Sequence, residues 1–331
     1  MAVLVTGAPG WLGTTLVERL DDRGEDVRCL VYPGVDVGEL DPFDVTVARG
    51  DVTDQESVLE AFTDDVETVF HCAGVNHPAV RGGVSLIHEI NAEGTRHVLE
   101  AARRHDVDHL VYISSIVAQG FNEGPEDVIT EETPMRPRTE YGKSKLQAER
   151  YVRDYRERHG IEYTVLRPCW YYGPGQPPRM ATLMRQIASG RPIMFGDGTN
   201  RRSMTYVPAL VDLMTRVVDQ PAASKDEAFV VADRNVYTTN EIYETMARHI
   251  GVDDLNPIRL REPLPTVMKY LQRTLERVDV HFREAHVAWE MSRHIAADPS
   301  KAIDVLGWGP PESLDPGMET AVDWAKEHGQ V

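Results

Sequence analysis

Apolar runs and amphipathic stretches alternate along the first half of the chain. Short apolar runs, each long enough for a buried strand, lie at residues 3–5, 26–32, 47–52, 66–74 and 109–115. Between these runs lie stretches whose apolar residues recur at helical spacing, at residues 12–20, 55–62, 91–103 and from about 140 onward. Strands that alternate with helices in this way predict βαβ units, and hence an α/β fold built on a doubly wound parallel sheet.

Three glycines stand where the first predicted strand meets the first predicted helix. Gly7, Gly10 and Gly13 form a G-x-x-G-x-x-G pattern, which differs from the G-x-G-x-x-G dinucleotide pattern but can do similar work. One glycine permits the turn, one lets the backbone approach a pyrophosphate, and one allows close packing of helix on strand. Because a helix N-terminus offers free N–H groups and a positive dipole end, the pattern predicts a phosphate site.

The pattern loosens beyond about residue 175, where stretches rich in Pro, Arg and Met separate shorter elements. We therefore expect a dinucleotide-binding domain over residues 1–174 and a smaller, mainly substrate-binding domain over 175–331, with some segments returning to the first. Residues 207–218 predict a core helix. Residues 265–278 predict an amphipathic helix that could pack on its own domain, cover an apolar substrate, or lie on a membrane surface.

Composition and charge narrow the class of protein. The 331 residues carry a formal net charge of −18, which favours solubility and argues against a nucleic-acid partner. No run approaches about 18 unbroken apolar residues, and the chain begins directly in a predicted strand, so we expect neither a membrane span nor a leader peptide. Cys29, Cys72 and Cys169 are far apart and form no C-x-x-C pair, so we expect buried thiols in a cytoplasmic protein and no metal site.

Side chains suited to acid–base chemistry follow the predicted strand at 109–115. Ser114 and Ser115 stand at its carboxyl end, the side on which parallel sheets bind ligands. Tyr141 and Lys145 are four residues apart and share a face near the N-terminus of the next helix. A tyrosine of pKa roughly 10 is a poor base near neutrality, but a neighbouring ammonium and a helix N-terminus favour the phenolate. Ser115 could then hold a substrate oxygen while Tyr141 exchanges its proton.

Two other strand ends bear on the choice of cofactor. The second predicted strand ends near Tyr32, where an acidic residue would bind the ribose 2′-hydroxyl of NAD and a basic one the 2′-phosphate of NADP. Tyr32 is neither, and a 2′-phosphate without a cationic partner is poorly compensated, so NAD is expected over NADP. Asp51 ends the third strand and could accept from the adenine amino group, or it could cap the next helix, for which Asp54 is the better candidate.

The motifs TGAPGWLG, GDVTD, HCAG, ISS and YGKSK, in this order, resemble those of the extended short-chain dehydrogenase/reductase family, also called the NAD-dependent epimerase/dehydratase family. The resemblance continues through LRPCWYYGPG, GDGTNRRSMTYV and ADPSKAIDVLGWGP, so it covers nearly the whole chain. It implies a Rossmann-like fold, an NAD(P)-dependent enzyme and a homodimer formed through the helices that begin near Asn91 and Tyr141.

The same resemblance implies roles for individual residues. Tyr141 would be the catalytic acid/base, Ser115 would polarise the substrate oxygen, and Lys145 would also bind the nicotinamide ribose. The residues implied to bind the cofactor are Gly7, Gly10, Trp11, Leu12, Gly13, Tyr32, Asp51, Val52, Ala73, Gly74, Tyr141, Lys145 and Pro168.

The motifs leave two substrate classes open. Arg202 falls where sugar-nucleotide epimerases that resemble this chain place an arginine on the substrate pyrophosphate, a task that suits a guanidinium. Trp170 and Ser203 depart from the Asn and the acidic residue that are usual there, and LRPCWYYGPG looks more like the 3β-hydroxysteroid dehydrogenase and dihydroflavonol reductase branch. Arg202 could also be a surface charge in a Gly-rich loop. Trp170 and Arg202 are the predicted substrate-binding residues.

We therefore expect hydride transfer between a nicotinamide cofactor and a secondary carbinol or ketone of a small molecule. The first candidate is a sugar-nucleotide or related sugar epimerase or dehydrogenase, and the alternative is a dehydrogenase or ketoreductase of an apolar cyclic alcohol or ketone. Dehydration is disfavoured because the fifth predicted strand lacks the Thr-Asp-Glu type of sequence found in sugar 4,6-dehydratases. A catalytically silent dinucleotide sensor is a third possibility, against which the intact pair Tyr141 and Lys145 argues.

Overall fold

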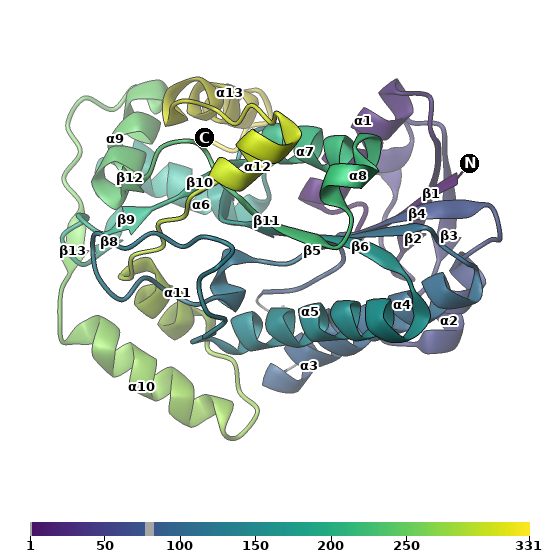
Figure 1. The fold of residues 1–331 in the computed structure, drawn as a ribbon. Helices are drawn as coiled ribbons and strands as arrows, with labels where there is room; N and C mark the ends of the chain where they lie inside the picture. The colour runs from purple at the N-terminus through teal and green to yellow at the C-terminus, as the bar shows by residue number, and fades with distance from the viewer. Residues whose placement is uncertain (1, 77–82) are drawn as a thin grey trace.

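The computed structural model describes residues 2–76 and 83–331 (Figure 1). At its centre is a seven-stranded sheet of order β11-β6-β5-β4-β1-β2-β3, in which every neighbouring pair is parallel. Its strands are β1 (Ala2–Thr6), β2 (Asp26–Val31), β3 (Val45–Arg49), β4 (Val66–His71), β5 (His109–Ile113), β6 (Glu162–Pro168) and β11 (Glu227–Val231). The doubly wound parallel sheet predicted from the sequence is therefore confirmed, and its last strand comes from beyond residue 174.

The winding of the sheet reverses at β1, which has β2 on one side and β4 on the other. The register aligns Thr6, the last residue of β1, with Leu30 and His71. The carboxyl ends of these three strands therefore meet at one edge of the sheet. In an open parallel sheet, such a switch point is where a ligand-binding crevice forms.

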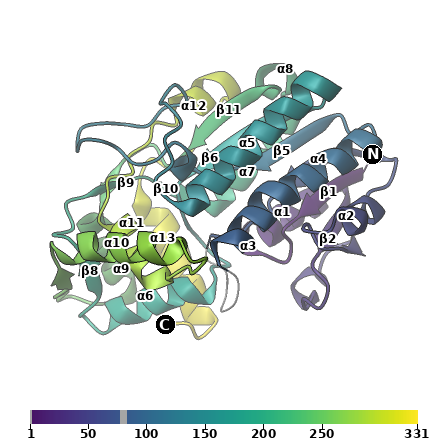
Figure 2. The same ribbon diagram turned by 90° about the horizontal axis from the view of Figure 1, so that it is seen from below.

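Helices cover both faces of the sheet (Figures 1 and 2). Val3 and Val5 face one layer of helices, while Leu4 faces the other. Burial on both faces explains why the inner strands appear in the sequence as continuous apolar runs rather than as alternating patterns, whereas the edge strand after residue 44 is largely exposed. The first layer contains α1 (Trp11–Asp22), α7 (Val207–Asp219) and α12 (Ser300–Leu306), and the second contains α2 (Gln55–Ala61), α4 (Gly94–Arg104) and α5 (Glu140–His159).

Helix boundaries follow from capping residues that the sequence shows. Helix α5 begins after Thr139, whose Oγ1 accepts a hydrogen bond from the N–H of Gly142 at 3.0 Å, and ends at Gly160 with φ of +79°. Helix α2 begins after Asp54, whose carboxylate accepts from the N–H of Glu56 at 3.1 Å. Asp54 is therefore the cap of this helix, as predicted.

The helix predicted at residues 91–103 begins earlier than the sequence indicates. Helical backbone runs through α3 (Val84–His88), a π-helical turn η2 (Glu89–Glu93) and α4. The π turn contains Asn91, a fully buried side chain. The side chain of Asn91 forms hydrogen bonds with Val75 and Ser144, which lie outside this helix. A polar residue that interrupts the apolar pattern is therefore accommodated inside the helix, and the pattern does not mark where the helix begins.

A second core lies beyond the sheet and contains Met184, Met246 and Met318. It is formed mainly by segments after residue 175, whereas β11, α7 and α12 from the same half pack with the central sheet. The elements on the side of this second core are short strands and helices: β7 (Trp170–Tyr172), α6 (Pro178–Ala188), β8 (Ile193–Phe195), β9 (Arg201–Arg202), β10 (Met204–Tyr206), β12 (Tyr237–Thr238), α9 (Thr239–Ile250), β13 (Ile258–Leu260), α10 (Leu264–Glu276), α11 (Arg283–Met291) and α13 (Leu314–Glu327).

Helix α10 forms as predicted, but it buries its apolar side only in part: Met268 and Leu275 are half-buried. It lies against α11, and its buried residues are Pro265 and Gln272, whereas Val267 and Leu271 are 53% and 41% exposed. Gln272 occupies the contact because its amide oxygen accepts from the N–H of Phe282 at 3.0 Å. The expectation that this helix packs on its own domain is confirmed by its contact with α11, although Val267 and Leu271 on its apolar side stay exposed. No helix in the described ranges has the length and apolar character needed to cross a membrane.

Candidate active site

The glycine loop lies against the end of β4 with no space for side chains. Gly7 has φ of +88°, and a Cβ there would come within 2.7 Å of the backbone nitrogen of Ala73. A Cβ on Gly10 or on Gly13 would come within 2.6 Å of the carbonyl oxygen of Gly7. All three glycines are therefore required by close backbone contacts at the switch point between β1 and β4.

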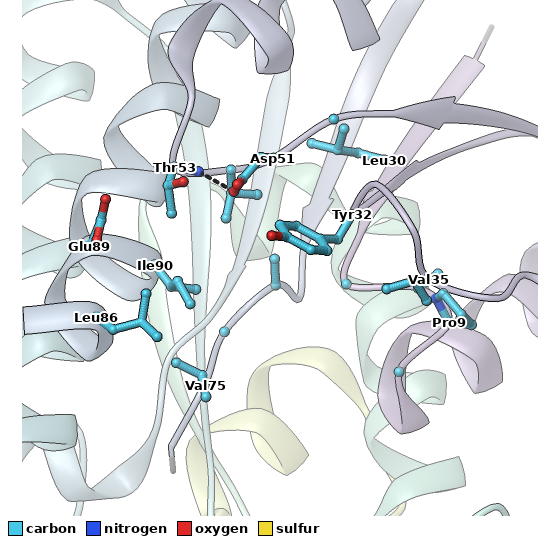
Figure 3. A pocket seen from close by; sticks show the side chains of 17 residues that line it. Pro9, Leu30, Tyr32, Val35, Asp51, Thr53, Val75, Leu86, Glu89 and Ile90 are labelled. Atoms are coloured by element: carbon cyan, nitrogen blue, oxygen red, sulfur yellow. Dashed lines mark hydrogen bonds between the residues drawn. The ribbon is translucent and has the colours of Figure 1, made fainter. Parts of the chain in front are cut away.

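A cavity of about 440 Å³ lies beneath this loop (Figure 3). Its walls come from the glycine loop, the ends of β2 and β3, the turn after β4, and the start of the helix that contains Leu86 and Ile90. The predicted cofactor-binding residues that line it are Gly7, Gly10, Tyr32, Asp51, Val52, Ala73 and Gly74. The lining residues that sequence reasoning missed are Ala8, Pro9, Leu30, Val35, Gly50, Thr53, Val75, Leu86, Glu89 and Ile90.

Two polar residues mark the ends of β2 and β3 at this cavity. Tyr32 is 59% exposed at the rim. The carboxylate of Asp51 accepts a hydrogen bond from the N–H of Thr53 at 2.9 Å, and so folds back over its own loop (Figure 3). Since Asp54 caps α2, Asp51 is not that cap, and its side chain lines the cavity instead.

The other six predicted cofactor-binding residues are not among those that line the cavity: Tyr141 and Lys145, described below, and four that surround the loop. The indole of Trp11 turns away and donates to the carbonyl of Pro174 at 2.6 Å. Leu12 is buried in the core with α1. Gly13 lies in α1 behind the loop, and Pro168 is buried at the end of β6. The structure therefore places these four around the site as supports, and not among the residues that line this cavity.

Lys145 is buried between the ends of β4 and β5. Its Nζ donates to the carbonyl of Ile113 at 2.9 Å and lies 5.9 Å from the ring centre of Tyr141. Burial lowers the pKa of Lys145 to about 8, so the side chain still carries a proton at neutral pH. A Cβ on Gly74 would come within 3.0 Å of this Nζ and 3.1 Å of the side-chain oxygen of Asn91, so a larger residue in the turn after β4 would crowd the ammonium.

The two serines at the end of β5 have different surroundings. Ser114 is buried and donates to the carboxylate of Glu149 at 2.7 Å, so it faces away from the proposed chemistry. Ser115 has extended backbone, a half-buried side chain, and leads into the short turn η3 (Ile116–Ala118). The sequence predicts both serines at the strand end, but only the tertiary contacts show that Ser114 is bound to Glu149 while Ser115 stays half-buried.

Asn91 connects the turn after β4 to α5, and sequence reasoning missed it. Its side-chain oxygen accepts from the N–H of Val75 at 2.8 Å, and its amide nitrogen donates to the Val75 carbonyl at 2.7 Å and to Ser144 at 3.0 Å. The signal was available, because Asn91 stands on the same helical stripe as Val98 and Ala102. A polar residue at a core position indicates hydrogen bonds in the interior.

The two predicted substrate-binding residues lie together. The guanidinium of Arg202 stands over the ring of Trp170, with 5.2 Å between the guanidinium carbon and the ring centre. Arg202 is buried, and burial lowers its pKa. Its Nη1 donates to the carbonyl of Glu290 at 3.2 Å, whereas its Nε has no hydrogen-bond partner among the described residues. The alternative that Arg202 is a surface charge is therefore wrong.

A model of the NAD dependent epimerase/dehydratase family matches residues 3–232. The chain belongs to this family. The uncharacterized protein y4nL of Sinorhizobium fredii is 35% identical over 99% of this chain and 96% of its own. UDP-glucose 4-epimerase of Vibrio cholerae is 29% identical over 96% of this chain and 93% of its own. The chain is thus an NAD-dependent enzyme of the extended short-chain dehydrogenase/reductase type, as the sequence motifs predict, and the third possibility of a silent sensor loses its support.

The fold also agrees with a solved structure. UDP-glucose 4-epimerase from Thermotoga maritima, crystallised with UDP-glucose, superimposes with a TM-score of 0.79 over 99% of both chains, at 23% sequence identity. At that level of identity the similarity shows the fold alone. It confirms the Rossmann-like architecture.

Proposed function

We propose that the protein transfers a hydride between NAD and a secondary carbinol of a nucleotide-linked sugar, as an epimerase or dehydrogenase. In this proposal residues 1–174 bind the cofactor and carry the catalytic side chains, and residues 175–331 mainly hold the substrate. The observation that carries the substrate class is Arg202, a buried guanidinium with an unpartnered Nε beside Trp170.

The lining of the cavity beneath the glycine loop supports a dinucleotide as its ligand. Close backbone contacts at Gly7 and Gly10 leave a surface on which a pyrophosphate could approach the N-terminus of α1. Asp51 and Tyr32 stand at the ends of β3 and β2, where the adenosine half would lie, and Leu86 and Ile90 give an apolar wall. NAD, when bound, supplies the hydride acceptor.

The chain's own residues would then manage the proton. We propose Tyr141 as the group that takes the carbinol proton and returns it, and Ser115 as the hydroxyl that holds the same oxygen. Lys145 is protonated and lies 5.9 Å from the Tyr141 ring centre, so its charge favours the phenolate. Its hydrogen bond to the Ile113 carbonyl fixes the ammonium in the gap that Gly74 leaves.

Arg202 would bind the diphosphate of the substrate. Burial of a guanidinium is costly, and the nearby carboxylate of Glu290 opposes the lowering of the Arg202 pKa. The Nε of Arg202 has no hydrogen-bond partner among the described residues, and an anionic ligand would give it one. The similarity to a UDP-glucose 4-epimerase makes UDP-sugars the first ligands to try.

Thermal melting with NAD, UDP and both together tests this proposal, because a ligand of the native state raises the melting temperature by mass action. We expect UDP to raise it beyond the value with NAD alone. In Arg202→Gln this additional rise should be lost, with UDP affinity weaker by about 2–5 kcal/mol. The control is Arg201→Gln, which removes a neighbouring guanidinium that donates to the Pro125 carbonyl on the exposed side.

Each outcome has a consequence. If Arg201→Gln keeps the UDP response and Arg202→Gln loses it, the sugar-nucleotide class is supported. If Arg202→Gln responds to UDP normally, Arg202 does not bind the diphosphate and the main support for the class is removed. If the protein shows no response to UDP or other nucleoside diphosphates, this substrate class is wrong. An apolar cyclic alcohol or ketone then becomes the leading candidate.

A further inference from the structure

Four basic side chains surround a second cavity, of about 170 Å³, outside the site described above. Lys269 and Arg273 come from α10, Arg293 follows α11, and Arg138 immediately precedes the cap of α5. Segments far apart in the sequence therefore bring four cations together in a chain whose formal net charge is −18. The cavity has room for several waters of about 30 Å³ each, and so for one phosphate or carboxylate group.

The cavity wall offers little negative charge to balance these cations. Among the residues that the structure describes, Glu123 is the one acidic residue in the wall, and Glu262 lies 3.7 Å from Arg293 and partly opposes the lowering of the Lys269 pKa. Within the part of the chain that the structure describes, Arg138, Lys269 and Arg273 have no ion pair. Burial and the three neighbouring guanidinium groups lower the pKa of Lys269. The like charges thus repel one another at a place where an anion would relieve the repulsion.

An aromatic side chain completes the wall. Trp289 is 94% buried, and its ring centre lies 5.4 Å from Nζ of Lys269 and 5.9 Å from the guanidinium carbon of Arg273. Among the described residues, no hydrogen-bond acceptor is found for Nε1 of Trp289 or Nε of Arg293, and both atoms are buried. Buried N–H groups are seldom left without acceptors, and the Lys269 and Arg273 side chains are already positioned by the indole.

We propose that this cavity is an anion-binding site for a phosphate or carboxylate group, distinct from Arg202. It lies beside the proposed active site, because Phe121 in its wall packs with Tyr141 against the same apolar cluster. The anion is an acidic group on the substrate or a separate small anion. Both sources share the chemistry that four cations recognise.

Titration calorimetry of the full chain with sodium pyrophosphate tests the site, at constant ionic strength and with saturating NAD to occupy the proposed pyrophosphate site at the glycine loop. We expect saturable binding to the unaltered protein and to Arg202→Gln, and at least tenfold weaker binding to the double variant Lys269→Gln/Arg273→Gln. The matched control is Arg277→Gln/Arg283→Gln, which removes the same charge from the same helix pair but from residues outside the cavity wall. NAD affinity and the melting temperature without anion verify that each variant is folded.

Three results would overturn the proposal: no saturable binding, equal loss in the control pair, or loss in Arg202→Gln alone. None of them depends on the sugar-nucleotide reaction, so the two proposals fail separately. Titration of UDP-glucose and UDP-glucuronic acid, which differ by one carboxylate, into the same variants identifies the source of the anion. Weaker binding of UDP-glucuronic acid alone in Lys269→Gln/Arg273→Gln assigns the site to an acidic group of the substrate, and unchanged binding of both assigns it to a separate anion.

Discussion

Lys145 and Tyr141 show how single side chains depend on their neighbours for their chemistry. The ammonium of Lys145 lies close to Gly74, where a Cβ would crowd it at 3.0 Å, and it donates to the end of β5. The proton shuttle proposed for Tyr141 requires its hydroxyl, whereas the positive charge beside it is supplied independently by Lys145.

Tyr141→Phe should therefore abolish turnover of UDP-glucose while leaving NAD affinity nearly unchanged. Turnover is followed by the isomer ratio of the sugar or by formation of NADH, and NAD affinity by calorimetry. Tyr151→Phe is the control, since Tyr151 lies on the same helix and donates to Glu93 at 2.7 Å, remote from the site. Full activity in Tyr141→Phe would remove this residue from the mechanism.

Asp233 is a buried carboxyl group whose titration makes folding stability depend on pH. It accepts hydrogen bonds from the hydroxyl of Tyr172 at 2.7 Å and from the N–H of Tyr206 at 3.2 Å. Burial raises its pKa from 3.8 to about 7. The folded state holds this proton more tightly than the unfolded state, so protonation of Asp233 stabilises the fold. This contribution to the free energy of unfolding is fully present below pH 3.8 and is lost as the pH rises through 7.

Asp233→Asn should remove this dependence. Relative to the unaltered protein, the free energy of unfolding of the variant should rise between pH 5 and pH 7, with a slope of up to about 1.4 kcal/mol per pH unit. Urea denaturation of both proteins at a series of pH values measures it. A constant difference between the two across that window would show that Asp233 has no raised pKa.

At the scale of elements, α5 is held to the sheet by a buried ion pair behind the catalytic face. Glu149 is completely buried on α5, and Arg167 of β6 donates to both of its oxygens, at 2.9 and 2.8 Å. Ser114 donates to the same carboxylate, so the network ties α5 to the ends of β5 and β6. Arg153 also pairs with Glu149, but its side chain is 38% exposed.

Arg167→Met should destabilise the fold by about 3–5 kcal/mol, because it leaves a buried carboxylate without its main partner. Arg153→Met removes an ion pair to the same carboxylate from the exposed side, and should cost about 0–1 kcal/mol. Urea denaturation measures the loss in the free energy of unfolding of each variant relative to the unaltered protein. Equal losses would mean that burial does not determine the strength of this network.

At the scale of the whole molecule, one contact joins the segment after α10 to the cofactor side. Asp279, just beyond α10, accepts from the N–H of Ser85 at 2.8 Å and from its hydroxyl at 2.7 Å. Ser85 belongs to α3, and the next residue, Leu86, lines the proposed cofactor cavity. The substrate side of the molecule therefore caps the helix that forms one wall of the cofactor cavity.

Asp279→Ala should loosen this wall without unfolding the protein. We expect faster amide exchange over residues 84–88 and faster dissociation of NAD, since local opening of α3 exposes the cavity. Hydrogen exchange followed by mass spectrometry and stopped-flow release of NAD measure these changes. Asp253→Ala, an exposed carboxylate elsewhere on the substrate side, is the control. Unchanged exchange in α3 would show that the contact does not hold the helix.

Local patterns in the sequence determined most of the sheet and the catalytic half of the site. Buried parallel strands need continuous apolar runs, tight phosphate turns need glycine, and a helix places residues i and i+4 on one face. Gly7, Gly10, Tyr141 and Lys145 could be identified for these reasons, and the family follows from the order of their motifs.

Only the tertiary structure decided which side chains face the cavities. It turned Trp11 toward Pro174 and Ser114 toward Glu149, buried Arg202 against Trp170, and left Val267 exposed. It also brought cations from three separate segments around the second cavity. Periodicity reports which face of an element is apolar, whereas burial and partners depend on contacts between residues far apart in the chain.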